Sequence, residues 1–390
     1  MKKKLLIIAN YNIGTSQSGG DTIFLELIKY WQSKFEITVL GAQESKNLLI
    51  RYQLNNINFV KTDEVNIDSS PTVINLFKHT IRRIIMGIYT VLNNKELIKS
   101  SEYCYTVSDF YPDFILGIIY KILNQKGTWI SGHYLFVPKP TDKQSPYEHE
   151  KLKGWLYYFS QIPSRYLGYK FADIIYVTSL PDVDRFPGKK VIVIRGGVDT
   201  TDAKKFLNSK KVVKKIYEGL FIGRLHPQKG VLEMVDIWKI LCKKLPKAKL
   251  AIIGDGILNK QLITKIKTKK LQKNITLFGF QVGAKKYELI EKSKIILHPA
   301  IYDSGGMASA DAMAFGLPGV SFDLPALKTY YPQGMIKTEI GNKQLFADNI
   351  YNLLTDSKHY NKTSNQALNL INNHWEWSSQ AKSIYQQTFK

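Results

Sequence analysis

Two segments of the chain combine charged side chains with glycines in patterns suited to binding a phosphate. In the first, the apolar run Leu220-Phe-Ile leads into Gly223, and Arg224 and Lys229 follow. An arginine can donate two parallel hydrogen bonds to phosphate oxygens, whereas a lysine acts as a point charge. Cations are common in loops, so this pattern alone is weak evidence for a phosphate site.

The second segment spans residues 297–318, where an apolar strand ends at His298 and a loop leads into a helix of small residues. The helix is predicted to begin near Gly305 or Gly306 and to end at Gly316, two residues before a proline. Glycines at a helix N-terminus let backbone N–H groups approach an anion, which the helix dipole also favours. We therefore expect a pyrophosphate-binding site there, formed by Gly305, Gly306 and Met307.

Two carboxylates accompany this helix. Asp303 precedes it and Asp311 lies one and a half turns inside it. A carboxylate on a core-facing, alanine-rich helix is unfavourable without hydrogen-bond partners. Sugar and ribose hydroxyls would supply such partners; alternatively, Asp311 faces water.

The elements that position these residues are predicted from short apolar strands alternating with helical patterns, which is typical of parallel βαβ sheets. In the first half, strands are expected at residues 4–9, 35–40, 103–107, 127–131, 174–178 and 191–195. The pattern restarts with strands at 219–222, 250–253, 275–278 and 294–298. A chain of 390 residues fits two such domains. We predict an α/β fold of two Rossmann-like doubly wound domains facing a central cleft, with ligands at the carboxyl ends of the strands.

Four segments in order resemble one known family. They are Gly223-Arg-Leu-x-x-x-Lys-Gly230, Ile252-Ile-Gly-Asp-Gly256, Phe278-Gly-Phe280 and Asp303-x7-Asp311-Ala-Met-Ala-x-Gly-x-Pro318. Together they are similar to the retaining GT-B glycosyltransferases of family 4 (glycosyl transferases group 1). In the first half, Gly19-Gly20, Trp129-Ile-Ser-Gly-His133 and Gly196-Gly-Val-Asp199 resemble the glycine loop, the strand ending in histidine and the interdomain turn of that family.

The resemblance implies domains at residues 1–198 for the acceptor and 199–365 for a nucleotide-sugar donor, with a C-terminal helix at 366–390 crossing back to the first domain. It implies retaining sugar transfer from a UDP- or GDP-sugar, with no cofactor and no metal required. The resemblance also implies catalytic roles for His133, Arg224, Lys229 and Asp303. Donor contacts fall on Gly19, Gly20, Gly223, Gly254, Phe280, Ser304, Gly305, Gly306, Met307 and Asp311.

In these roles, Arg224, Lys229 and the helix start would stabilise the departing diphosphate, and its phosphate oxygen would take the acceptor proton. Asp303 and His133 would position the sugar and Asp311 the ribose. Alternatively, His133 is a core histidine; His298 and His226 are expected to be structural. The sequence departs from the family in having aspartates at both ends of the seven-residue spacer, where glutamates are usual, and Gly305 in place of a bulky aromatic residue.

Charge and composition limit the kinds of partner and compartment that we expect for the chain. The net charge is +23, and residues 201–390 hold 30 lysines and arginines against 14 acidic residues, an excess of 16. Much of this charge is expected to be solvated helix surface. The two cysteines form no disulfide framework or zinc site, and no signal peptide or membrane span is apparent. The chain is therefore expected in the cytoplasm.

The acceptor is expected to be a glycan or a polyprenyl-linked or other glycolipid. Residues 76–92 and 155–169 each combine an apolar face with a basic border, which predicts attachment to an anionic membrane surface. The alternative is that both are ordinary packing helices. A nucleotide-sugar epimerase or a phosphorylase would also fit this scaffold, as would a non-catalytic binder of sugar nucleotides. Nucleic-acid binding rests on the charge alone and is not favoured.

Overall fold

The computed structural model of the chain describes residues 2–12, 18–64, 73–142, 145, 147, 151–208, 213–303 and 305–390. The chain forms two compact units. Unit 1 consists of Met1–Lys139, Leu152–Ile194 and Gln380–Lys390, and unit 2 of Pro140–Lys151 and Arg195–Ser379. The domain boundaries predicted at residues 198 and 365 remain a proposal.

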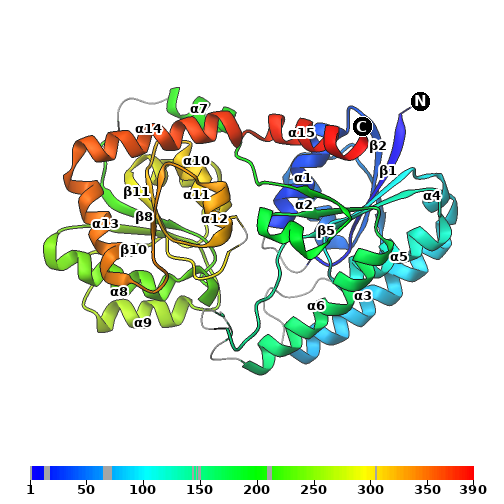
Figure 1. Cartoon of the computed structure of the whole chain (residues 1–390), viewed down its shortest axis with the longest axis horizontal. Coiled ribbons are helices and arrows are strands. Elements are labelled where there is room, and N and C mark those ends of the chain that lie inside the picture. Colours follow the sequence, from blue (N-terminus) through cyan, green and yellow to red (C-terminus); the bar gives the residue numbers. More distant parts are fainter. Residues whose placement is uncertain are drawn as a thin grey trace. The chain divides into compact units, whose positions relative to one another are not determined.

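Unit 1 contains a parallel sheet of seven strands in the order β3-β2-β1-β4-β5-β6-β7 (Figure 1). The strands are β1 (Lys3–Ala9), β2 (Phe35–Gly41), β3 (Asn58–Lys61), β4 (Tyr103–Thr106), β5 (Thr128–His133), β6 (Ile174–Val177) and β7 (Lys190–Val193). Its helices are α1 (Gly19–Trp31), α2 (Gln43–Arg51), α3 (Val73–Asn93), α4 (Lys95–Ser100), α5 (Tyr111–Leu123) and α6 (Lys151–Phe171), with a 3-10 turn at Leu180–Arg185.

The last helix, α15 (Trp377–Phe389), packs in unit 1 from Gln380 onward. The Trp31 indole donates a hydrogen bond of 3.1 Å to the Ala381 carbonyl, and the Phe389 ring lies 4.7 Å from that of Phe35. The segment 366–390 is not one helix, because α14 (Ser357–His374) ends before Trp375. There the Trp375 carbonyl accepts a hydrogen bond of 2.7 Å from the backbone of Val198.

Unit 2 contains a parallel sheet of six strands in the order β10-β9-β8-β11-β12-β13. The strands are β8 (Tyr217–Ile222), β9 (Leu250–Ile253), β10 (Ile275–Leu277), β11 (Ser293–His298), β12 (Gly319–Phe322) and β13 (Met335–Thr338). The strand order reverses between β8 and β11, which are neighbours although β9 and β10 lie between them in sequence. Together the two sheets confirm the predicted class of two Rossmann-like doubly wound α/β domains.

Helices cover both faces of the second sheet, because alternate strand residues are apolar on both sides. One core contains Phe221 and Leu297 and is covered by α8 (Val231–Lys244), α9 (Asn259–Thr268) and α13 (Lys343–Thr355). The other contains Leu220 and Ile296 and is covered by α10 (Gly283–Glu291), α11 (Met307–Met313), α12 (Pro325–Tyr330) and α14. The unit also includes α7 (Thr200–Asn208) and a 3-10 turn at Pro227–Lys229. In Figure 1 these helices lie on either side of the strands.

Within the described ranges, no helix combines the length and the apolar character that crossing a bilayer requires.

Candidate functional site

The loops that follow β8, β9 and β10 pack directly on one another at the carboxyl edge of the second sheet. The Gly254 N–H donates a hydrogen bond of 2.8 Å to the Gly279 carbonyl. Gly254 has a φ of +148°, and a Cβ there would lie 1.8 Å from the Gly223 carbonyl oxygen. Only glycine permits this approach. The predicted donor-site residues Gly223 and Gly254 are therefore in backbone contact, and Phe280 follows at the exposed end of the third loop.

The loop after β8 also meets the loop after β11. Gly230 has a φ of +64°, and a Cβ there would lie 1.8 Å from the Pro299 carbonyl oxygen. The backbone N–H of Ile301 donates a hydrogen bond of 3.1 Å to the Gln228 carbonyl. This contact places Lys229, the last residue of the 3-10 turn, beside Asp303.

Asp303 is the centre of a buried charged group. Its Oδ2 atom lies 2.5 Å from Lys229 Nζ and 3.1 Å from His298 Nε2. Burial by itself would raise the pKa of Asp303, but Lys229 and His298 outweigh it and hold that pKa well below its usual range. The carboxylate is therefore ionised at neutral pH and can accept hydrogen bonds but cannot donate a proton.

Polar contacts from neighbouring segments hold the start of α11 in place. The Tyr331 hydroxyl donates a hydrogen bond of 2.7 Å to the carbonyl of Gly306, the N-cap residue, and Ser309 Oγ lies 3.3 Å from His298 Nδ1. Gly305 is buried against the Tyr330 ring, where a Cβ would lie 3.1 Å from the nearest ring carbon. Ser304 lies outside the described residues.

The helix begins at Met307, directly after the predicted start at Gly305 or Gly306. It ends at Met313, before the predicted stop at Gly316, because residues 314–316 form a turn. A helix of seven residues has a weak dipole, so an anion here would depend more on nearby cations than on the helix.

Asp311 has a protein partner that the sequence patterns do not reveal. Its Oδ2 atom lies 2.9 Å from Lys286 Nζ on α10, and the carboxylate is partly exposed. The alternative in which Asp311 faces only water is therefore not what the structure shows.

Arg224 differs from the other charged residues of these loops. Its side chain is exposed, and among the described residues it makes no ion pair or side-chain hydrogen bond. Its guanidinium group is therefore available to an external anion.

The remaining predicted residues belong to unit 1. Gly19 and Gly20 form the first turn of α1, which Ser18 caps: its Oγ accepts a hydrogen bond of 3.2 Å from the backbone of Asp21. A Cβ on Gly20 would lie 3.1 Å from the ring of Tyr134, the residue after His133. The glycine pair and the end of β5 therefore lie close together.

His133 is fully buried. Its Nε2 atom lies 3.1 Å from Ser131 Oγ, and its Nδ1 atom lies 3.8 Å from Asp109 Oδ2. Burial, and then the Arg165 cation, lower the pKa of His133 to about 3, so the imidazole is neutral at physiological pH. Burial raises the pKa of the neighbouring Asp109 to about 7.

The structure places in the site three residues that the sequence patterns did not assign to it. His298 was expected to be structural, and Lys286 and Tyr331 stand in none of the motifs. The geometry adds His298 and Lys286 to the two aspartates and Tyr331 to the start of α11. The position of His298 at the end of a buried strand was a usable signal, since polar residues at carboxyl ends of parallel strands often contact ligands.

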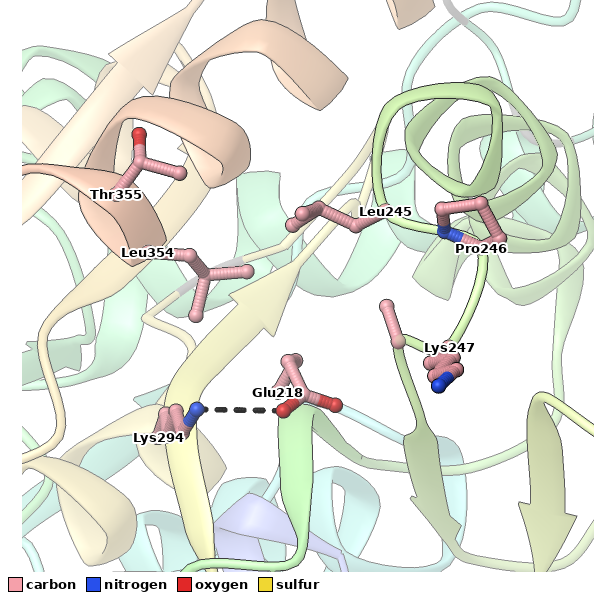
Figure 2. A pocket seen from close by; sticks show the side chains of 8 residues that line it. Glu218, Leu245, Pro246, Lys247, Lys294, Leu354 and Thr355 are labelled. Atoms are coloured by element: carbon pink, nitrogen blue, oxygen red, sulfur yellow. Dashed lines mark hydrogen bonds and ion pairs between the residues drawn. The ribbon is translucent and has the colours of Figure 1, made fainter.

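A pocket of about 410 Å³ elsewhere in unit 2 lies at the opposite edge of the same sheet. Figure 2 shows Glu218 and Lys294 facing each other at its floor, with a distance of 3.2 Å between Oε1 and Nζ. Both residues stand near the amino ends of their strands, β8 and β11. Its remaining lining consists of Leu245, Pro246, Lys247, Ala248, Leu354 and Thr355, so it shares no residue with the loops described above. Among the described residues, no group of three or more His, Cys, Asp or Glu side chains could hold a metal ion.

One family model is similar to most of the second unit. The family model described as "Glycosyl transferases group 1" matches residues 202–370, which include both phosphate-type segments.

Two curated relatives are similar over part of the chain. Poly(ribitol-phosphate) alpha-N-acetylglucosaminyltransferase of Staphylococcus aureus is 24% identical over 207 residues, which are 52% of this chain and 38% of that protein. Poly(glycerol-phosphate) alpha-glucosyltransferase of Bacillus subtilis is 25% identical over 158 residues, which are 40% of this chain and 23% of that protein. The chain thus matches well under half the length of either relative.

A solved structure shares the fold over nearly the whole chain. Anabaena HepE in complex with UDP and glucose has a TM-score of 0.71 and 16% identity, and the match covers 98% of each chain.

Proposed function

We propose that the chain is a glycosyltransferase that moves a sugar from a UDP- or GDP-sugar to a glycan or lipid-linked acceptor, as part of polysaccharide, glycolipid or glycoprotein assembly. The observation that carries this proposal is the pair of loops after β8 and β11, at the point where the strand order of the second sheet reverses. Ligands of open α/β sheets bind at such points. The match to glycosyl transferases group 1 covers both loops, and a protein of the same fold has been solved with UDP and glucose.

The exposed Arg224 is the residue best placed to bind the donor diphosphate. Its charge is not offset by any ion pair among the described residues, unlike that of Lys229. When the bond between sugar and diphosphate breaks, negative charge grows on the leaving phosphate, and the guanidinium bound to that phosphate would stabilise it. Lys229 would add a second cation, since its ammonium group needs only a small movement to share its charge between Asp303 and a phosphate oxygen.

The carboxylates and His133 would then act by positioning. Asp303 is ionised and could accept hydrogen bonds from sugar hydroxyls, and Asp311 could do the same for the ribose. With a pKa of about 3, His133 would act as a neutral hydrogen-bond partner and not as a general acid. The acceptor proton would therefore pass to an oxygen of the leaving phosphate.

We further propose transfer with retention of configuration and without a metal ion. The names of both curated relatives specify an alpha product, which retention would give from an alpha-linked donor. Those names also make a polyol-phosphate chain the first acceptor to try, and its negative charge suits a protein with a net charge of +23.

The test begins with the shift in unfolding temperature on adding UDP, GDP or ADP and their glucose or N-acetylglucosamine conjugates. One nucleotide series should stabilise the protein. Arg224→Ala should weaken that binding by about 10- to 100-fold, since hydrogen bonds to charged groups contribute about 1.5–3 kcal/mol, and should leave the unliganded protein equally stable. Lys260→Ala, which removes an exposed cation on α9, is the matched control. Equal binding by the two variants would contradict the assignment of Arg224.

Activity is then measured with the stabilising donor and a set of glycan, polyol-phosphate and lipid-linked acceptors, in the presence of EDTA. The anomeric configuration of the product is determined by NMR. A product that forms without any acceptor and is an isomer of the donor would indicate an epimerase instead, and a sugar phosphate would indicate a phosphorylase.

A further inference from the structure

Two helices of unit 1 present large apolar side chains to solvent along one stripe each. On α3 the exposed residues follow helical spacing, from Phe77, with 66% of its surface exposed, to Leu92; the set is Ile74, Phe77, Ile81, Ile85, Tyr89 and Leu92. On α6 they run from Leu152, which is 77% exposed, to Tyr169; the set is Leu152, Leu156, Phe159, Ile162, Tyr166 and Tyr169. Such contiguous apolar surface marks an interaction site.

The opposite faces of both helices are already occupied by the fold. On α3, Arg83 is buried with its guanidinium 2.7 Å from Glu44, and Gly87 packs against Leu116 of α5. On α6, the Gln161 side chain donates to the Leu135 carbonyl at 2.7 Å, and Gly168 packs against His133. None of the stripe residues is among the buried core residues of the described chain.

The two helices lie on the same face of the first sheet. The connections β3-α3-α4-β4, β4-α5-β5 and β5-α6-β6 all progress in one direction across the sheet, and right-handed crossovers place such helices on one side. Both also contact α5, α3 through Leu116 and α6 through the Tyr111 hydroxyl, which donates to the Ser160 carbonyl at 2.7 Å. In Figure 1, α3 and α6 run the same way along the lower part of unit 1.

The charge of these helices is of one sign. Their sequences contain Lys78, Arg82, Arg83, Lys151, Lys153, Arg165 and Lys170 and no aspartate or glutamate. Arg82 and Arg83 have acidic partners in Asp63 and Glu44. Lys78, Lys151 and Lys170 are exposed and form no ion pair with any residue that the structure describes.

We propose that the outward faces of α3 and α6 bind the surface of a bilayer containing anionic phospholipids. Apolar side chains flanked by lysines suit this surface, because the rings and aliphatic chains enter the headgroup boundary while the ammonium groups meet lipid phosphates. A second copy of the chain suits it less, because a symmetric contact would bring like charges together. Both helices begin at the carboxyl edge of the sheet, so the membrane would lie beside the end of β5, which carries His133, and the start of α1, which carries Gly20.

The experiment is flotation of the full chain with vesicles of phosphatidylcholine alone and of phosphatidylcholine with one quarter phosphatidylglycerol, at low and high salt. We expect binding to the anionic vesicles, weakened by salt. The variant Lys78→Gln/Lys151→Gln/Lys170→Gln should bind about a hundredfold more weakly, since each cation near the surface contributes about fivefold. The matched control, Lys260→Gln/Lys267→Gln/Lys273→Gln, changes the net charge equally in unit 2 and should bind almost as the wild type does.

The apolar contribution is tested by Phe77→Ser/Ile85→Ser/Leu156→Ser/Phe159→Ser. This variant should lose binding by at least a further factor of about ten for each helix. Four exposed apolar residues of unit 2 provide its control, in the variant Ile257→Ser/Ile263→Ser/Val282→Ser/Leu345→Ser.

Failure of the wild type to float with anionic vesicles would overturn the proposal, as would equal loss in the unit 2 controls. So would a dimer in solution that the apolar variant converts to a monomer, since a second copy would then cover the stripes. None of these readouts involves a nucleotide sugar. Unchanged unfolding temperatures of the unliganded variants show that they are folded and keep the two proposals separable.

Discussion

Replacing Lys229 by methionine removes the cation that lies 2.5 Å from the buried carboxylate of Asp303. The side chains of Lys229 and Asp303 are 19% and 8% exposed, so water cannot take the place of the lost charge. Removing one partner of such a buried pair lowers the free energy of unfolding by about 3–5 kcal/mol. His298 remains 3.1 Å from the carboxylate, which places the expected loss at the lower end of that range. For a domain of the size of unit 2, the unfolding temperature should fall by about 6–12 °C.

The loss should depend on pH in a definite direction. In the wild type the pKa of Asp303 is depressed, so its stabilising contribution is present above the unfolded-state pKa of 3.8 and is lost as pH falls through the folded-state value. In Lys229→Met the effect of burial on the pKa is no longer outweighed, so the folded-state pKa rises. Acid then protonates Asp303 and removes its unpaired charge. The free-energy difference between wild type and variant should therefore be largest at pH 7 and shrink towards pH 4.

Chemical denaturation of both proteins from pH 4 to 8 measures this difference. The double variant Lys229→Met/Asp303→Asn removes both charges and should recover most of the lost stability at pH 7. A difference that stays constant across the pH range, or a double variant no more stable than Lys229→Met, would refute the assignment of Asp303 as a buried ionised group.

Two further predictions concern the loops of unit 2 and the core of unit 1. Gly254→Ala should destabilise unit 2 by at least about 2 kcal/mol, because its Cβ would lie 1.8 Å from the Gly223 carbonyl oxygen. Gly341→Ala is the control for backbone strain alone, since Gly341 has a φ of +85° but open space around it. Equal losses of stability in thermal unfolding of the two variants would count against the close contact. Asp109→Asn should make the protein more stable than the wild type at pH 8. The raised pKa of Asp109, about 7, means that its contribution is present below the unfolded-state value of 3.8 and is lost as pH rises through 7, so a stability difference that grows on acidification would contradict it.

The main strands of both sheets were predictable because each is a short apolar run between turn residues. The predicted strand at 4–9 corresponds to β1, and that at 294–298 corresponds to β11. The strands that were not predicted are β3, β12 and β13, each of four residues. Length does not explain this, because the predicted strands β4, β6, β7 and β9 also have four residues. β3 is only half-buried at the edge of its sheet, so it lacks a continuous apolar run.

The charged residues of the candidate site were visible as residue types, but their partners were not. Lys229 and Asp303 are 74 residues apart in sequence, and Lys286 and Asp311 are 25 apart. Neither spacing corresponds to a local structure, so sequence patterns cannot pair them. The pairing of Lys229 with Asp303 depends on β8 and β11 being neighbours, which is a property of the strand order.

The reversal of strand order also explains why the two loops can meet. Strands β8, β9 and β10 progress outward in one direction, and β11 returns to the other side of β8. The connections on the two sides therefore pass over opposite faces of the sheet, and the loops after β8 and β11 begin side by side at its carboxyl edge. Gly230 and Pro299 bring these two loops into backbone contact. Arg224 lies on the same loop and remains exposed, so one cation of this loop is paired with Asp303 and the other has no ion-pair partner among the described residues.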